Sequence, residues 1–221
     1  MRTLTQRELN RTLLARQLLL ARVKLNVPRA VGRLVALQAQ YAPSPYMALW
    51  SRLDGFRKEQ LTRALERGTV VKATTIRGTL HVAAAPDFPF LQTAYIESRR
   101  GRSTNLGVDL GALRAAFPDR PLTGKEVFEL AGQALGTDDR WTIAFALRAL
   151  TFVRTPPLGA WPHHAPSPAV IVRDPLPSPE EGAARVVRAY LAAYGPASRD
   201  DVEQFTGFRV RQIEPVLEGM R

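Results

Sequence analysis

Residues 58–83, KEQLTRALERGTVVKATTIRGTLHVA, change their hydrophobic period partway along, and this change predicts the fold. Residues 58–66 have the spacing of an amphipathic helix, and Gly68 is the expected left-handed stop after it. Residues 69–75 and 79–83 then have the pattern of two short strands joined across a glycine-containing turn, which predicts a hairpin. Helices followed by a hairpin are typical of a winged helix, a helix-turn-helix variant whose wing adds a second nucleic-acid contact.

Three further helices are predicted before this unit. The first is expected at residues 6–21, where a Thr5–Glu8 capping box precedes an apolar face of Leu9, Leu13, Leu14 and Leu18. The second is expected at residues 28–40 and begins at Pro28. The third follows the cap residue Ser44, and its side chains expected to point mostly inward are Met47, Leu49, Trp50 and Leu53. This order places several helices ahead of the wing, as a winged-helix domain requires.

The end of the second expected helix carries two glutamines, Gln38 and Gln40, on either side of Ala39. Residues two apart on an intact helix point about 200° from each other, so their side chains cannot reach the same site. Pro43 and Pro45 follow closely and disfavour continued helix. If the chain unwinds around Ala39, both carboxamides can turn into one cleft.

The second half of the chain repeats this plan in outline. A helix is expected from Pro86 to about residue 97, and further helices are expected at 109–116, 123–135, 138–150, 179–194, 199–205 and 209–218. Strands are expected at 151–155 and 169–173. The Pro-rich loop between them, at 156–168, resembles a longer second wing. The predicted fold class is therefore mainly α with short β hairpins, in a tandem winged-helix architecture. We expect a first winged-helix domain at 1–98, a linker at 99–108, a second winged-helix-like domain at 109–178, and the start of a third, incomplete helix-turn-helix at 179–221. Since that last unit lacks a wing, a C-terminally truncated product is expected.

The positive charge is concentrated in the first half. Residues 1–104 carry 18 Lys and Arg against 6 Asp and Glu, whereas residues 105–221 carry 13 against 14. A concentrated basic surface favours binding to a polyanion, because each neutralised phosphate releases counterions. A solvated basic surface is the alternative interpretation, since 27 of the 31 basic residues are arginine. Double-stranded DNA is the expected partner.

The composition also excludes several classes of protein. The chain has no cysteine, which excludes disulfides, cysteine-held zinc and iron–sulfur clusters. His163-His164 has no third ligand at metal spacing, and Gly-rich phosphate loops are missing. No apolar run reaches the roughly 18 residues that a membrane span needs. We therefore expect a cytoplasmic monomer without cofactor, metal or membrane contact.

The Gln38-Ala39-Gln40 motif resembles the Q-x-Q signature of the AlkZ/YcaQ-type winged-helix DNA glycosylases. Three more segments carry the resemblance in order, namely Leu9-Asn10-Arg11, Leu49 to Leu53 (LWSRL) and Arg77 to His81 (RGTLH), and it extends more weakly through Tyr194-Gly195-Pro196-Ala197. The resemblance implies a DNA-repair enzyme that removes alkylated purines or unhooks interstrand crosslinks. Members of that family continue beyond the length of this chain, into a further winged-helix portion and a β-barrel.

The residue types at the motif fit such chemistry. An N3- or N7-alkylated purine is already cationic and leaves readily, so the enzyme mainly steadies the sugar cation and places a water. A carboxamide oxygen accepts a hydrogen bond from that water while its NH₂ donates to phosphate or sugar. Gln38 and Gln40 are therefore the predicted catalytic residues of a monofunctional DNA glycosylase. Without a lysine nucleophile beside them, hydrolysis without strand cleavage is expected.

Three residues of the hairpin are the predicted DNA-binding residues. Lys72 and Arg77 can contact phosphate, and His81 can orient a sugar or phosphate. Tyr46 and Trp50 either stack near a lesion or, as their helical spacing favours, fill the core. Two other functions stay open, a non-catalytic winged-helix DNA-binding regulator and a protein–protein module that meets an acidic partner, because winged helices serve all three.

Overall fold

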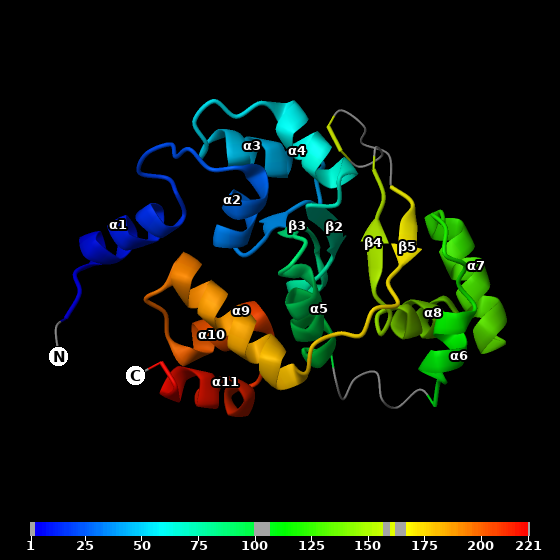
Figure 1. The fold of residues 1–221 in the computed structure, drawn as a ribbon. Coiled ribbons are helices and arrows are strands. Elements are labelled where there is room, and N and C mark those ends of the chain that lie inside the picture. Colours follow the sequence, from blue (N-terminus) through cyan, green and yellow to red (C-terminus); the bar gives the residue numbers. More distant parts are fainter. Residues whose placement is uncertain (1–2, 100–106, 157–159, 162–166, 221) are drawn as a thin grey trace.

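The computed structural model describes residues 3–99, 107–156, 160–161 and 167–220. Within these residues the chain is mostly helical and has one antiparallel sheet, in the strand order β1-β3-β2-β4-β5 (Figure 1). This confirms the predicted fold class of mainly α structure with short hairpins.

The first part of the chain forms α1 (Gln6–Arg16), α2 (Val27–Arg33), α3 (Ser44–Trp50) and α4 (Lys58–Glu66). The capping box of Thr5 and Glu8 at the start of α1 and the left-handed Gly68 after α4 are confirmed. The prediction that the first helix reaches residue 21 was wrong, because the chain turns at Leu18, where φ is 58° and the side chain is buried. No residue of α1 is buried, and Leu13 and Leu14 are each 40% exposed.

The predicted helix at residues 28–40 was also wrong, since α2 ends at Arg33 and the chain enters β1 (Leu37–Gln38). The break lies at Val35, which has a φ of 70°. Its side chain packs into the core beneath α9, while Leu37 packs into a different core with α2 and α4. The left-handed conformation of Val35 redirects the chain between the two residues, so they enter different cores and Leu37 can pair with β3.

The predicted hairpin is confirmed as β2 (Val70–Thr74) and β3 (Leu80–Ala84), with a short turn at Ile76–Gly78. Its tip packs against the protein, because Ile76 is buried and Arg77 lies against α10 (Arg199–Thr206). The second predicted hairpin forms β4 (Phe152–Arg154) and β5 (Ala169–Ile171), and β4 pairs with β2. Both hairpins therefore belong to one sheet, and the division into domains stays a prediction.

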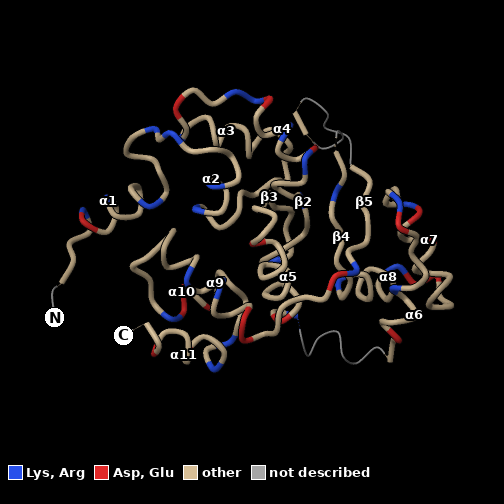
Figure 2. The backbone as a smooth tube through the Cα atoms, viewed as in Figure 1, with Lys and Arg blue, Asp and Glu red and all other residues tan. Residues whose placement is uncertain are grey.

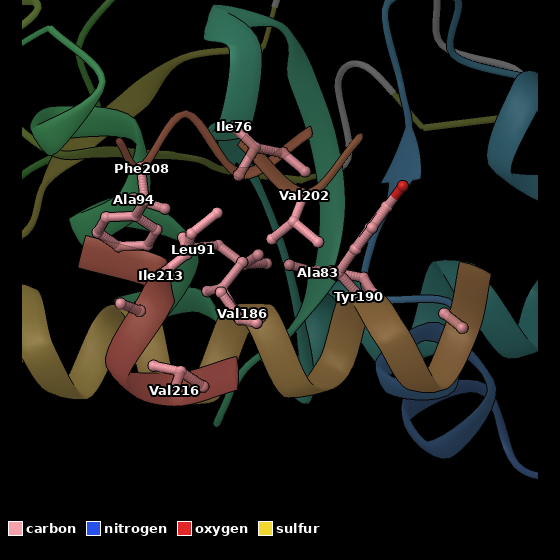
Figure 3. Close-up of a cluster of buried hydrophobic side chains, with 14 of the residues drawn as sticks. Ile76, Ala83, Leu91, Ala94, Val186, Tyr190, Val202, Phe208, Ile213 and Val216 are labelled. Atoms are coloured by element: carbon pink, nitrogen blue, oxygen red, sulfur yellow. The ribbon is translucent and has the colours of Figure 1, made fainter. Parts of the chain in front are cut away.

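The other helices are α5 (Phe88–Glu97), α6 (Leu110–Ala115), α7 (Gly124–Leu135), α8 (Arg140–Leu147), α9 (Pro179–Tyr194) and α11 (Val210–Glu218). Helices α6–α8 gather beside β4 and β5 at one end of the molecule, and α1 lies at the other end (Figure 1). Helices α9–α11 pack on α5 and the first hairpin around Phe208, Ile213, Leu91 and Val186 (Figure 3). The last three helices thus share a core with the wing near the Q-x-Q segment.

Helix α3 buries a different face from the one predicted. Leu49 and Leu53 are buried as expected, but Met47 and Trp50 are 54% and 50% exposed. Tyr46, one turn before Trp50, is buried instead. Helix α3 is a short element that packs on β1 and α4, so its buried face is set by these neighbours and not by its own pattern.

Candidate nucleic-acid and catalytic site

The two glutamines flank Ala39 at the end of β1, where the chain is extended and no longer helical. Gln38 and Gln40 are exposed, whereas Ala39 between them is 1% exposed and belongs to the core. The extended pairing continues past Gln38, because the Ala39 N–H donates to the Leu80 carbonyl at 2.7 Å. Side chains two apart on an extended chain share a face. The chain is therefore unwound at Ala39, and the unwinding begins earlier, at Val35.

The two carboxamides differ in their hydrogen bonds. Gln40 Oε1 accepts from the backbone N–H of Leu80 at 2.8 Å, and so continues the β1–β3 ladder with a side chain. Gln38 makes no hydrogen bond to another described residue through its carboxamide. Gln40 thus has a structural role at its oxygen, whereas both polar atoms of Gln38 remain open to water or a ligand.

His81 lies directly across the ladder from Gln38, on β3. It is 3% exposed, and its Nδ1 lies 2.9 Å from the Thr79 carbonyl oxygen and 3.1 Å from Thr75 Oγ1. Burial lowers the pKa of His81, the hydrogen bond to Thr79 raises it, and the nearby Arg77 lowers it. The imidazole is therefore neutral near pH 7, and the contact with a carbonyl assigns its proton to Nδ1, which leaves a lone pair on Nε2.

Arg77 is exposed at the tip of the first hairpin, close to an aromatic cluster of α9 and α10. Its guanidinium lies 5.7 Å from the centre of the Phe205 ring. Tyr190, Tyr194 and Phe205 contact each other with ring centres 4.5 to 5.2 Å apart. Burial raises the pKa of Tyr194, while Arg77 and Arg52 lower it. Both guanidinium groups therefore lie near its hydroxyl.

This aromatic cluster was not found by sequence reasoning. Its residues are more than 100 positions away from the Q-x-Q motif along the chain, and they become neighbours only because α9 and α10 pack on the hairpin. Arg52 belongs to the LWSRL segment, and the sequence predicted no role for it. It donates from Nε to the Gln17 carbonyl at 2.8 Å and from Nη1 to the Ala48 carbonyl at 3.0 Å, which ties the segment after α1 to α3.

Lys72 occupies a different place from the other predicted DNA-binding residues. It is 8% exposed in the middle of β2, opposite Val82 on one side and Arg154 on the other. Burial lowers the pKa of Lys72, and the neighbouring Arg154 lowers it further. The ammonium is therefore not on the outer surface of the hairpin, which weighs against direct phosphate contact.

The two aromatic residues of α3 have separate roles. The Tyr46 hydroxyl lies 3.0 Å from Thr62 Oγ1 and accepts from the Trp161 backbone N–H at 3.1 Å, so Tyr46 is part of the core, as its spacing indicated. Trp50 is exposed, with the Arg22 guanidinium 4.6 Å from its ring centre. Trp50 is thus available for stacking and does not fill the core.

Lys and Arg positions, blue on the backbone tube of Figure 2, recur along α1–α4 and the loops between them. Arg57, Lys58, Arg63 and Arg67 are exposed on and beside α4. Among the described residues no group of three His, Asp or Glu side chains is placed to hold a metal ion, and His163-His164 lies outside those residues. In the part of the chain that the structure describes, each helix is too short or too polar to cross a membrane.

Comparison with known proteins identifies a family and a similar fold. A family model described as "DNA glycosylase AlkZ-like" matches residues 31–221. The solved structure of the Streptomyces sahachiroi DNA glycosylase AlkZ superposes with a TM-score of 0.76 at 19% sequence identity, over 99% of this chain. The chain spans 66% of that protein's length. At this identity the likeness shows the fold. No curated protein matches the chain.

Proposed function

Because the chain belongs to the AlkZ-like DNA glycosylase family, we propose that it hydrolyses the N-glycosidic bond of alkylated purines in double-stranded DNA, N3- or N7-alkylated bases and interstrand crosslinks among them. The observation that carries this proposal is the exposed, uncommitted carboxamide of Gln38, which lies beside Gln40 on an extended segment and opposite a neutral histidine. These are hydrogen-bonding groups without a strong acid or base.

Such groups suit a substrate that already carries its positive charge. General-base catalysis by an ionisable side chain contributes roughly 10²–10⁴-fold, and a glutamine cannot supply that. A cationic alkylated purine does not need protonation before it leaves, so the remaining task is to place water at the sugar C1′ and to stabilise the developing cation. In this proposal Gln38 Oε1 accepts a hydrogen bond from the attacking water, and its NH₂ donates to a sugar or phosphate oxygen.

His81 and Arg77 complete the proposed site. The lone pair on His81 Nε2 can accept a hydrogen bond from the second O–H of the attacking water, because the neutral ring carries its proton on Nδ1 and donates it to the Thr79 carbonyl. The exposed Arg77 guanidinium is close enough to lower the pKa values of His81 and Tyr194, and it is the cation best placed to meet a phosphate beside the reacting sugar. Gln40 holds β1 against β3 through Leu80 and so fixes where Gln38 points.

The exposed basic residues of α4 and its preceding loop would hold the duplex by its phosphates. Contacts of this kind position the DNA without reading its sequence. The logarithm of their binding constant falls linearly with the logarithm of the salt concentration. Arg57, Lys58, Arg63 and Arg67 supply four such charges within a single segment. Lys72 is buried in the sheet and is not one of these exposed charges.

The proposal is tested by base release from a duplex with one N7-methylguanine. Wild-type protein is expected to release the base and leave an intact abasic strand, and Gln38→Ala is expected to lower the single-turnover rate by about 10²-fold while binding is kept. The matched control is Gln133→Ala, an exposed glutamine of α7. Equal release by Gln38→Ala and the wild type would remove Gln38 from the chemistry.

One observation favours the alternative of a non-catalytic DNA-binding protein. The hydrogen bond from Leu80 to Gln40 is the kind of backbone contact that a structural glutamine makes. Salt-dependent duplex binding without release from any alkylated DNA would support this alternative. Absence of duplex binding at low salt would instead support a module that binds an acidic protein.

A further inference from the structure

A second site is suggested by a cavity that the residues of the Q-x-Q segment do not line. It has a volume of about 350 Å³ and lies between α5, the start of α7, the end of α8 and strand β4. Its size falls within the range of roughly 300–1,000 Å³ that is typical of small-molecule sites. Gln38, Gln40 and His81 do not line it.

The cavity is strongly positive. Arg99, Arg148 and Arg154 line it, and no Asp or Glu does. Within the described residues none of the three guanidinium groups forms an ion pair, although Arg154 donates to the Ser167 carbonyl at 3.1 Å. Arg99 and Arg148 both act on the buried Tyr95 hydroxyl, where they oppose the rise in its pKa that burial causes. The Arg99 guanidinium lies 5.0 Å from the centre of the Tyr95 ring, which also lines the cavity.

Two buried polar atoms at the cavity have no partner among the described residues. Gln92 is 1% exposed, and its Oε1 accepts no hydrogen bond. The Arg99 Nε is likewise buried without an acceptor. A buried polar group without a partner costs free energy, and such an exception in a folded protein calls for an explanation. A ligand that donates to the amide and accepts from the guanidinium would explain both.

The remaining wall is apolar and partly aromatic. Phe128 and Leu147 contribute from α7 and α8, and Leu150 and Phe152 from the segment that enters β4. An occupant with a charged end and a flat apolar body fits this division of the cavity. Guanidinium groups bind phosphate through paired hydrogen bonds, and aromatic walls bind the faces of bases.

We propose that this three-arginine cavity binds a nucleotide unit, with its phosphate at Arg99, Arg148 and Arg154 and an amino-bearing base against the apolar wall, where the amino group donates to Gln92 Oε1. The unit is either a free nucleotide or one nucleotide of a DNA strand. The proposal does not depend on the glycosylase activity, because none of the residues proposed for that chemistry contributes to the cavity.

The test is isothermal titration of the whole chain with 2′-deoxyadenosine monophosphate in about 50 mM salt, where phosphate contacts are strong. Arg148→Gln is the informative variant, because its side chain is exposed and its ring contact is with Phe145 at 5.9 Å, so folding is kept. It is expected to weaken binding about tenfold or more. Arg188→Gln, on an exposed arginine of α9, is the matched control and should bind like the wild type.

The role of Gln92 is tested with deoxyinosine monophosphate, which lacks the amino group. Wild type should bind it several-fold more weakly than the adenosine form, and Gln92→Leu should bind the two alike. Displacement of the nucleotide by a single-stranded oligonucleotide would identify DNA as the source, and failure of displacement would identify a free nucleotide. Absence of binding, binding unaffected by Arg148→Gln, or equally tight binding of inorganic phosphate would each overturn the proposal.

Discussion

Replacing Gln40 by alanine should affect the stability of the protein, whereas replacing Gln38 should not. Gln40 Oε1 accepts one hydrogen bond, from the Leu80 N–H at 2.8 Å. A neutral hydrogen bond of this kind contributes about 0.5–1.5 kcal/mol to the free energy of unfolding. For a chain of this size about 1 kcal/mol lowers Tm by about 2–4 °C. Gln38→Ala removes no hydrogen bond to a described residue and should stay within about 0.5 kcal/mol of the wild type.

Thermal unfolding followed by circular dichroism, at one protein concentration and one pH, measures both variants. Gln40→Glu is the rescue control, since its carboxylate keeps an acceptor oxygen for the Leu80 N–H and should recover most of the lost stability. The reasoning fails if Gln40→Ala melts with the wild type, or if Gln38→Ala loses as much stability as Gln40→Ala. In either case the two glutamines would not divide into a positioning residue and an uncommitted one.

Two further predictions concern the framework. Gly207→Ala should destabilise the protein by about 2 kcal/mol or more, because Gly207 has a φ of 77° and an added Cβ would lie inside contact distance of Ser98 Cβ. Gly136→Ala, with a φ of 63° and open space at its Cβ, should cost only the backbone strain of about 1 kcal/mol, and equal denaturant midpoints for the two variants would contradict this. The backbone N–H and hydroxyl of Thr123 hold the pKa of Glu126 at about 2, below its ordinary value of 4.5, so its stabilising effect is present above pH 4.5 and is lost as the pH falls towards 2. Denaturant unfolding between pH 6 and pH 2 should therefore show a smaller acid-induced loss for Glu126→Gln than for the wild type.

The position of the first wing bears on how DNA would be held. In a winged helix the hairpin supplies a second contact to nucleic acid. Here the tip at Ile76 is buried and Arg77 lies against Phe205. Of the basic residues of the described hairpin, Arg77 is exposed whereas Lys72 and His81 are buried. The hairpin thus contributes more to the framework beneath Gln38 than to an independent DNA contact.

Local sequence determined the elements whose signals are short-range. The capping boxes at Thr5 and Thr123, the glycine stop after α4 and the hairpin around Gly78 all occur where the residues indicated. These features depend on contacts three to five residues apart, or on the positive φ that glycine allows, so the sequence is sufficient for them. The Q-x-Q motif was likewise identified from its residues alone.

Only the tertiary structure decided the shape of the site. The apolar periodicity before Gln38 predicted helix, yet the chain leaves the helical path at Val35, where φ is 70°, and Leu37 and Gln38 pair with β3. Pairing with β3 then placed His81 opposite Gln38, and both Gln38 and Gln40 are exposed. A residue's propensity is weak beside the burial of two large side chains and the satisfaction of backbone hydrogen bonds. These are contacts between segments about 40 residues apart, which no local pattern records.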